Sequence, residues 1–332
     1  MKRRKKPFII LAVILVVVLL VAGYIKFFNG RLIYFTTGMK SGELIKTAGQ
    51  KTTYTCEADI LMSDVKKEYE EMFGSNIWRE KIGDADFESY IKDQIKSKLM
   101  RVKAMNVKAK ERGVVLGREE KDSVGKAVDA FYNELTESQI SSTGITKDKL
   151  NTMFTEFAIA QKLYDDLTSS MDIEVSADEA RVIDIQYIVS DSEEDINKAY
   201  NLVNSGSSFF AVAKEYNADG EYEYELKRGE MDAAFEKAAF NLSTGEMSSI
   251  VEAAGRYYII RCTSDNDKAK TEVNKSAILE KRKLEQFNAD FEKYEAGIYM
   301  EFNNSEWKKL SIQDAYTLES SFEDTFNAYF GK

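Results

Sequence analysis

Residue types that usually carry acid–base, nucleophilic or metal chemistry are scarce in this chain. The sequence contains no histidine and two cysteines, Cys56 and Cys262, which lie far apart. They define neither a disulfide framework nor a zinc spacing, and each is expected to pack as a small apolar residue, with a single bridge as the alternative. Neither a metal site nor a cofactor is therefore expected. The chemistry of this protein should be of a kind that needs no imidazole and no metal.

The stretch 181–263 has the pattern of a small mixed domain. The β-branched residues of 182–189 predict a half-buried strand. Apolar residues at helical spacing then predict a helix that ends at Ser205-Gly206, and a second short apolar face follows at 209–213. A helix over 235–240 and a last strand over 255–262 complete the order of elements.

In this order the segments resemble the parvulin (rotamase, PpiC-type) peptidyl-prolyl isomerase domain. The residues that carry the likeness are Ser205-Gly206 followed by Phe209 to Tyr216, the turn Arg228-Gly229-Glu230-Met231, the helix Phe235 to Phe240, the corner Thr244 to Ser248, and the strand Gly255 to Arg261. The resemblance covers about a quarter of the chain. It implies a small antiparallel sheet wrapped by helices, with a substrate groove on one sheet face.

The resemblance also implies roles for single residues. Parvulins usually carry one histidine in the first strand and one in the last, and these positions fall here on Gln186 and Tyr258; the acidic or thiol position falls on Asp219. These three are the predicted catalytic residues. The residues predicted to bind the substrate's proline ring are Met231, Phe235, Phe240 and Leu226. The alternative is that the apolar residues belong to an ordinary core and that Asp219 is a turn residue before Gly220.

Prolyl isomerisation is compatible with such a site. An X-Pro bond has a barrier of roughly 18–20 kcal/mol that is set by amide resonance, and no bond is made or broken when it rotates. An apolar pocket that holds the twisted amide can therefore catalyse without a proton donor. The Gln186 amide and the Tyr258 hydroxyl could hydrogen-bond the substrate or each other.

The N-terminus has the pattern of a membrane anchor. Positions 2–6 are all basic, and no residue from Pro7 to Ile25 is charged, which approaches the roughly 20 apolar residues that a bilayer requires. Basic residues before the span should stay cytoplasmic, so the body is expected outside the cell membrane. A cleaved signal peptide is the competing interpretation, and a buried core helix is a poorer one.

Charge and length limit the partners and the number of domains. The net charge is −10, and without the five basic residues at positions 2–6 it is about −15. Nucleic acid is not expected to bind so acidic a body. The 332 residues leave room for about two domains after the anchor. Expected partners are unfolded or extended exported polypeptides and the membrane, and a homodimer is left open.

Amphipathic helices are predicted on both sides of the parvulin-like segment. The expected elements are a strand and turn at 45–50, a helix capped by Ser63, a helix from near Asp84 to Gly113, a helix over 124–135, a helix capped by Thr146 that extends to Tyr164, and a long helix over 273–294. A coiled coil is the alternative for the last of these. We expect the long helix to pack back on the earlier ones.

These patterns predict an α+β protein in which a parvulin-like domain is inserted into a mostly helical, chaperone-like domain. The expected segments are 1–28 (basic tip and transmembrane anchor), 29–175 (first helical part), 176–266 (parvulin-like domain), 267–312 (returning helix) and 313–332 (amphipathic tail). Trp307 to Ile312 suggests a strand or packed edge. The aromatic tail suggests a packed helix or, alternatively, a segment that engages a partner. The layout resembles PrsA- and SurA-type foldases, an analogy that rests on the order of the parts.

Three functions are compatible with these patterns. The first is a membrane-anchored prolyl isomerase that helps exported polypeptides to fold. The second is a holding chaperone whose parvulin-like domain lacks turnover and only binds peptide, which the absence of histidine favours. The third is an adaptor that docks one fixed envelope partner. Refolding of a proline-limited protein would distinguish the first from the other two.

Overall fold

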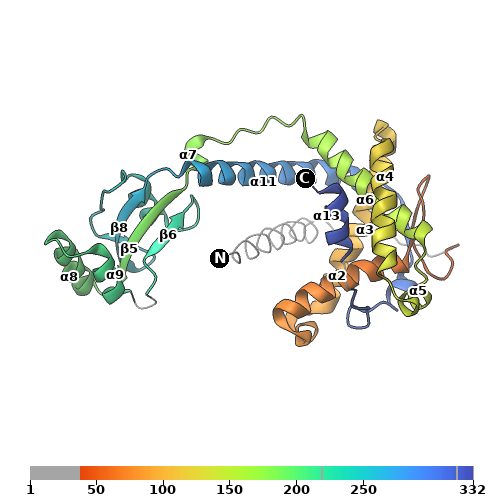
Figure 1. Ribbon diagram of the computed structural model, residues 1–332, viewed down its shortest axis with the longest axis horizontal. Coiled ribbons are helices and arrows are strands. Elements are labelled where there is room, and N and C mark those ends of the chain that lie inside the picture. Colours follow the sequence, from red (N-terminus) through yellow and green to blue (C-terminus); the bar gives the residue numbers. More distant parts are fainter. Residues whose placement is uncertain (1–37, 218–219, 319–320, 332) are drawn as a thin grey trace. The chain divides into compact units, whose positions relative to one another are not determined.

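The chain divides into two compact units, each described here by itself. The computed structural model describes residues 38–217, 220–318 and 321–331, and Figure 1 shows its elements. Met171–Glu285 form one unit, the sheet unit, and Met1–Ser170 with Gln286–Lys332 form the other, the helical unit. The predicted anchor at 7–25 lies outside the described residues. Within the described ranges, no helix combines the length and apolar composition that a bilayer crossing requires.

The sheet unit is built on a four-stranded antiparallel sheet with the strand order β6-β5-β8-β7. The strands are β5 (Ile183–Ser190), β6 (Glu223–Leu226), β7 (Val251–Ala253) and β8 (Arg256–Ser264). The helices of this unit are α7 (Ala177–Ala180), α8 (Glu193–Asn204), α9 (Phe209–Tyr216), α10 (Ala233–Phe240) and the first part of α11 (Lys268–Glu295). Helices α8 and α9 cover one face of the sheet and α10 covers the other. The predicted mixed fold is confirmed.

Alternation along β5 explains why helices cover both faces of this sheet. Ile183, Ile185 and Val189 belong to the apolar cluster under α10, whereas Ile188 belongs to the cluster under α8 and α9. Successive side chains of a strand point to opposite faces, so β5 has buried residues on both faces and is not the half-buried strand that was predicted from 182–189.

The helical unit contains most of the helices, together with a small sheet of order β2-β1-β9 and a two-stranded hairpin. Its elements are β1 (Glu43–Thr47), β2 (Thr53–Tyr54), α2 (Thr55–Phe73), η1 (Ser75–Arg79), β3 (Lys81–Ile82), β4 (Ala85–Asp86), α3 (Phe87–Arg112), α4 (Arg118–Asn133), α5 (Glu137–Thr143), α6 (Lys147–Thr168), the end of α11, β9 (Met300–Phe302), α12 (Asn304–Trp307) and α13 (Phe322–Phe330). Strand β1 pairs with β9, so Ile45 lies opposite Phe302. Segments from the two ends of the chain thus build one sheet.

Helix boundaries in this unit follow capping residues that the sequence displays. Asp86 accepts a hydrogen bond from Ser89 N at the start of α3, and Gly113, with a φ of 72°, ends that helix in the left-handed conformation. The Thr146 hydroxyl likewise accepts from Lys149 N at the start of α6. Such groups satisfy backbone donors and acceptors that the helix itself cannot pair.

One predicted helix start in this unit is wrong, and one of two alternatives for a later segment is excluded. Ser63 does not start a helix: α2 begins at Thr55, and the Ser63 hydroxyl donates to Asp59 O within it. For Trp307 to Ile312 the strand alternative is wrong, because Trp307 ends the short helix α12 and the strand of this region is β9. The packed-edge alternative agrees with the burial of Trp307 and Ile312. Serine is common at the start of a helix, but inside a helix its hydroxyl can also donate to the carbonyl four residues earlier, as Ser63 does here.

Charged residues are buried at the centre of the helical unit. Lys103, 1% exposed, donates from Nζ to Glu156 Oε1 at 2.6 Å and to Lys51 O at 2.8 Å. Glu57, 2% exposed, accepts from Tyr54 N at 2.8 Å. Two carboxylates therefore share the surroundings of one ammonium. Burial raises the pKa of Glu57 to about 8, although the charge of Lys103 opposes this.

This burial predicts that the helical unit loses stability as the pH rises. Because the pKa of Glu57 is raised from 4.5 to about 8 on folding, its stabilising contribution is complete below pH 4.5 and is lost as the pH rises through about 8. Burial also raises the pKa of Asp59 to about 6 and that of Asp64 to about 7, with the same sign. The variant Glu57→Gln keeps an acceptor for Tyr54 N and should reduce this pH dependence without abolishing it.

Urea unfolding followed by tryptophan fluorescence at pH 5 and pH 8 measures this effect. Both tryptophans of the chain, Trp78 and Trp307, lie in the helical unit, so the signal reports this unit alone. Replacing the exposed Glu119 by glutamine is the matched control and should leave the pH dependence as it is. The prediction would be contradicted if the free energy of unfolding changed between pH 5 and pH 8 by the same amount in the Glu57→Gln variant and in the parent chain.

Candidate active site on the α10 face of the sheet

Strand pairing shows which residues share the sheet face that α10 covers. Val189 lies opposite Tyr258, and Tyr187 lies opposite Ile260. Val189, Tyr258 and Ile260 are buried members of one apolar cluster, and Tyr187 packs against it while partly exposed. Because paired residues of neighbouring strands point to the same face, Tyr187 and Tyr258 both lie on the α10 side.

The turn before α10 holds Met231 at the edge of this cluster. Gly229 has a φ of 85°, a left-handed conformation that glycine adopts without strain. The Glu236 carboxylate accepts a hydrogen bond from Met231 N at 3.0 Å, and Asp232 accepts from Ala234 N at 2.8 Å to cap α10. Met231 is partly exposed and packs against the cluster. It is therefore accessible to a substrate.

Three of the four predicted substrate-binding residues form the core of this unit. Leu226 is 0% exposed, Phe235 1% and Phe240 5%, whereas Met231 remains partly exposed. For Leu226, Phe235 and Phe240 the alternative interpretation therefore holds: they are ordinary core residues. Of the four predicted residues, a substrate can therefore reach mainly Met231. We expect it to contact Met231 and the partly exposed residues beside it, such as Tyr187.

Tyr258 lies beside the predicted apolar residues. Its ring meets the Phe235 ring edge to face, with centroids 5.0 Å apart and planes at 81°. The Arg256 guanidinium interacts with the Tyr258 hydroxyl and is itself paired, through Nε, with Asp191 Oδ1 at 2.6 Å. Asp191 raises the pKa of Arg256 above its usual value, so this cation persists beside the hydroxyl. The structure thus brings together Tyr258, Phe235 and a charged pair.

The structure does not bring Gln186 to this site. Gln186 pairs with Arg261 on the opposite face of the sheet, and its Nε2 donates to Glu223 Oε1 at 3.1 Å. The predicted interaction of Gln186 with Tyr258 is therefore wrong. The β5 residue on the correct face is Tyr187, one position later, because a shift of one residue moves a strand side chain to the other face.

Asp219 lies outside the described residues, but the structure shows what holds the chain just before and after it. Asn217, 4% exposed, accepts from Val189 N at 2.9 Å and donates to Tyr187 O at 3.0 Å. The same amide donates to Glu221 O. The sequence did not predict that Asn217 would connect this segment to β5. The only signal available was an asparagine at the end of an apolar helix, and its partners on β5 are far away in sequence.

Tyr224 also lies on this face, although the sequence did not predict it as a site residue. Tyr224 of β6 pairs with Ile185, which places it on the α10 side, and its side chain is 38% exposed. Its hydroxyl lies 3.5 Å from Glu230 Oε2, and that carboxylate oxygen also accepts from Lys227 N at 2.9 Å. Tyr224, Tyr187 and Met231 thus offer accessible aromatic and apolar surface, with hydroxyl groups able to donate and accept hydrogen bonds.

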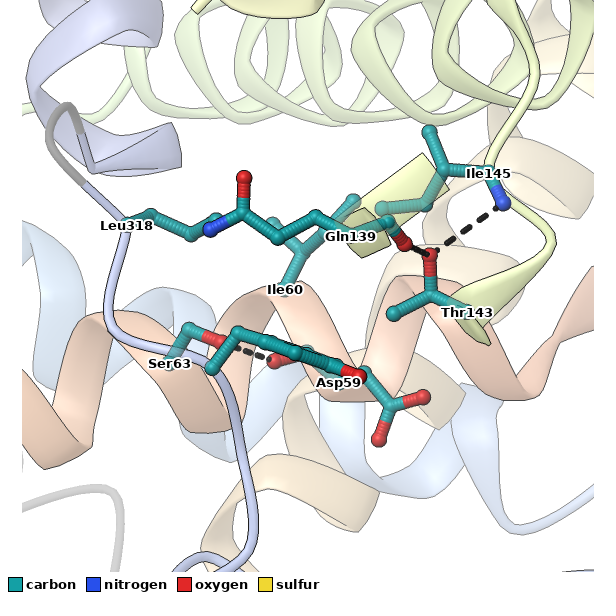
Figure 2. A pocket seen from close by; sticks show the side chains of 8 residues that line it. Asp59, Ile60, Ser63, Gln139, Thr143, Ile145 and Leu318 are labelled. Carbon is teal, nitrogen blue, oxygen red and sulfur yellow. Dashed lines mark hydrogen bonds between the residues drawn. The ribbon is translucent and has the colours of Figure 1, made fainter. Parts of the chain in front are cut away.

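A cavity in the helical unit is too small to compete as a ligand site. Figure 2 shows it between α2, α5 and the segment before α13. It measures about 10 Å³, which is room for about one water molecule. The residues that line it are Asp59, Ile60, Ser63, Gln139, Thr143, Ile145, Tyr316 and Leu318. The α10 face of the sheet remains the candidate active site.

Comparison with known proteins identifies the kind of domain to which most of the sheet belongs. Residues 189–264 match the Rotamase family, described as a PPIC-type PPIASE domain. The foldase protein PrsA of Caldanaerobacter subterraneus subsp. tengcongensis is 25% identical over 240 residues, which cover 67% of this chain and 73% of that protein. PrsA of Bacillus subtilis (strain 168) is 38% identical over 89 residues, or 24% of this chain and 30% of that protein.

Among solved structures, the peptidylprolyl isomerase PrsA of Bacillus cereus aligns over 87% of this chain and 99% of its own, with 20% identity and a TM-score of 0.37. The resemblance to parvulin-type isomerases and PrsA-like foldases that the sequence predicts is thus confirmed by the family match and the foldase relatives. Residues 189–264 are a parvulin-type peptidyl-prolyl isomerase domain, carried in a chain that is similar to PrsA foldases well beyond that domain.

Proposed function

We propose that this protein is a membrane-anchored extracytoplasmic foldase. Its sheet unit isomerises X-Pro bonds of exported polypeptides, and its helical unit holds the unfolded chain. Support comes from the isomerase family match over 189–264 and from relatives named foldase that match far beyond it.

The observation that carries the isomerase proposal is the position of Met231. It lies partly exposed at the edge of an apolar cluster, on the same sheet face as Tyr187 and Tyr258. Rotation about an X-Pro bond requires loss of amide resonance, with a barrier of roughly 18–20 kcal/mol. A surface that fits the twisted amide better than the planar one lowers this barrier. Met231 would contact the proline ring, and the tyrosine hydroxyls would hydrogen-bond the substrate backbone.

The proposed location rests on the sequence before the described residues. Five basic residues at positions 2–6 precede an uncharged stretch from Pro7 to Ile25. Such a segment spans a bilayer with its basic end in the cytoplasm, which puts the two units outside. Protease protection of the intact cell against the lysed cell would test this orientation.

Replacing Met231 by alanine should slow catalysed refolding by roughly tenfold, since loss of an apolar contact of about 1.4 kcal/mol in the transition state has that effect. The measurement is the rate of refolding of a proline-limited test protein with and without the chain. Asp219→Ala should also reduce the rate if the sequence-based role of this residue is correct. Leu202→Ala is the matched control, because this residue of α8 is 39% exposed and its helix covers the other sheet face.

A holding chaperone without turnover is the second candidate function. The chain has no histidine, and Leu226, Phe235 and Phe240 are enclosed in the core. This candidate predicts that the chain leaves the refolding rate of the test protein unchanged but suppresses its aggregation. The isomerase proposal fails if the parent chain gives no acceleration at all.

A further inference from the structure

The C-terminal helix α13 covers an aromatic surface of the helical unit. This surface, here called the aromatic face, consists of Phe131 of α4 and of Phe154 and Phe157 of α6. Phe322 of α13 packs against all three, with ring centroids 6.4, 4.6 and 4.9 Å away. Phe326 lies one turn later, with its ring 6.4 Å from Phe154 and 6.2 Å from Phe157. Helix α13 therefore contacts the aromatic face through residues four positions apart.

Side chains of α2 and α6 bind the backbone at both ends of α13. The Asp64 carboxylate accepts from Phe322 N at 3.0 Å and from Glu323 N at 3.1 Å. At the other end, Gln161 Nε2 donates to Phe330 O at 3.1 Å. The first N–H groups and last carbonyls of any helix lack partners within the helix. These contacts would therefore serve another helix of similar length, whatever its sequence.

Helix α13 has the properties of an occupant that can be exchanged. It has nine residues, and isolated helices shorter than about 12–15 residues are marginal in water. Of its residues only Phe322 is fully buried, while Phe326 and Phe330 are partly exposed. Its helical state thus depends on the surface that it covers.

The aromatic face would not stay hidden without α13. Phe131 and Phe154 are 1% and 0% exposed with α13 in place, and Phe157 is partly exposed. Exposed contiguous aromatic surface of this kind usually marks an interaction site. An amphipathic helix in an apolar groove is a common way in which proteins bind unfolded or peptide partners.

We propose that the aromatic face, with Asp64 and Gln161, is a binding site for amphipathic client segments, and that α13 is its intramolecular occupant. The fitting segment carries large apolar or aromatic residues at positions i, i+4 and i+8, as α13 does with Phe322, Phe326 and Phe330. An acidic residue in its first turn would reach Lys98, as Glu323 does at 3.7 Å. The inference rests on the proposed function only in taking the partner to be an unfolded polypeptide.

Binding of a labelled synthetic peptide with the sequence of residues 321–331 to the full chain tests the proposal. Weakening the occupant by Phe326→Ala should tighten peptide binding by roughly tenfold, because apparent affinity rises with the fraction of molecules whose site is open. Tyr329→Ala is the matched control: this residue lies on the same helix but is 38% exposed, so peptide affinity should not change. Equal affinities in the parent, Phe326→Ala and Tyr329→Ala chains would overturn the proposal.

A fluorescence measurement and a second variant distinguish an opened binding site from an unfolded helical unit. Tryptophan fluorescence reports whether the helical unit of each variant is folded, since Trp78 and Trp307 both lie there. If Phe326→Ala unfolds this unit, the milder Phe330→Ala, at the last turn of α13, takes its place with the same expected direction. Replacing the three phenylalanines of the peptide by alanine should abolish its binding to the Phe330→Ala chain; binding as tight as that of the original peptide would also count against the proposal.

Holding activity gives a readout that is independent of isomerisation. The client is an unfolded reporter polypeptide without proline, so the sheet unit has no bond to isomerise. Phe326→Ala should suppress its aggregation better than the parent chain, and added 321–331 peptide should reverse the gain. A chain that fails the refolding assay can still pass this test, so failure of the isomerase proposal and failure of this one are distinguishable.

Discussion

Replacing Lys103 by methionine is expected to destabilise the helical unit by about 3–5 kcal/mol, the usual cost of removing one partner of a buried ion pair. The Lys103 side chain is 1% exposed and that of Glu156 8% exposed, with Nζ 2.5 Å from Oε2. Glu57 lies in the same surroundings and also feels the charge of Lys103. Loss of the ammonium leaves Glu156 without its cation in a place that water does not reach.

Urea unfolding followed by tryptophan fluorescence measures this loss. The double variant Lys103→Met with Glu156→Leu should recover much of the stability, because two apolar side chains need no charge partner. Lys147→Met is the matched control: Lys147 pairs with Asp129 at 2.5 Å, but the two side chains are 50% and 61% exposed, so the loss should stay well under 1 kcal/mol. Similar losses for Lys103→Met and Lys147→Met would refute the importance of the buried pair.

Replacing Phe235 by alanine should destabilise the sheet unit by about 3–5 kcal/mol, the range for truncation of a buried aromatic residue. Phe235 is 1% exposed and packs edge to face on Tyr258. Its removal opens a cavity between α10 and the sheet, and the Tyr258 ring loses its partner. The change therefore affects both the stability of this unit and the position of Tyr258.

Hydrogen exchange of the peptides that contain β5 and β8 reports on this unit alone, and their protection should fall by two to four powers of ten, which corresponds to that loss. Phe210→Ala is the matched control, because Phe210 lies in α9 and is 43% exposed. Phe235→Leu should keep most of the stability, so any loss of isomerisation in that variant reflects the site. Protection as high in Phe235→Ala as in Phe210→Ala would show that this ring does not support the core.

Elements with a strong local pattern could be predicted from the sequence. The strand 182–189, the helix that ends before Ser205-Gly206 and the strand 255–262 correspond to β5, α8 and β8. The caps at Gly113 and Thr146 were also predicted. These features depend on hydrophobic periodicity and on single residues that satisfy helix ends, both of which act over a few positions.

The site was harder to predict, because a strand pattern that is apolar on both faces does not show which residue faces α10. Gln186 was predicted on the site face, but the structure places Tyr187, the next residue, on that face and Gln186 on the other. Nor does the sequence distinguish a partly exposed Met231 from an enclosed Phe235 in the same segment. Burial depends on what α10 and the sheet place above each side chain.

By itself the sequence determined the class of domain, the order of its strands and helices, and the absence of any histidine, since these depend on composition and on short-range patterns. The tertiary structure alone decided which tyrosines share a face, that Asn217 bridges to β5, and that α13 covers the aromatic face with its ends bound by Asp64 and Gln161. The physical reason is that these contacts join residues remote in the chain. Their partners are selected by packing, which no local pattern encodes.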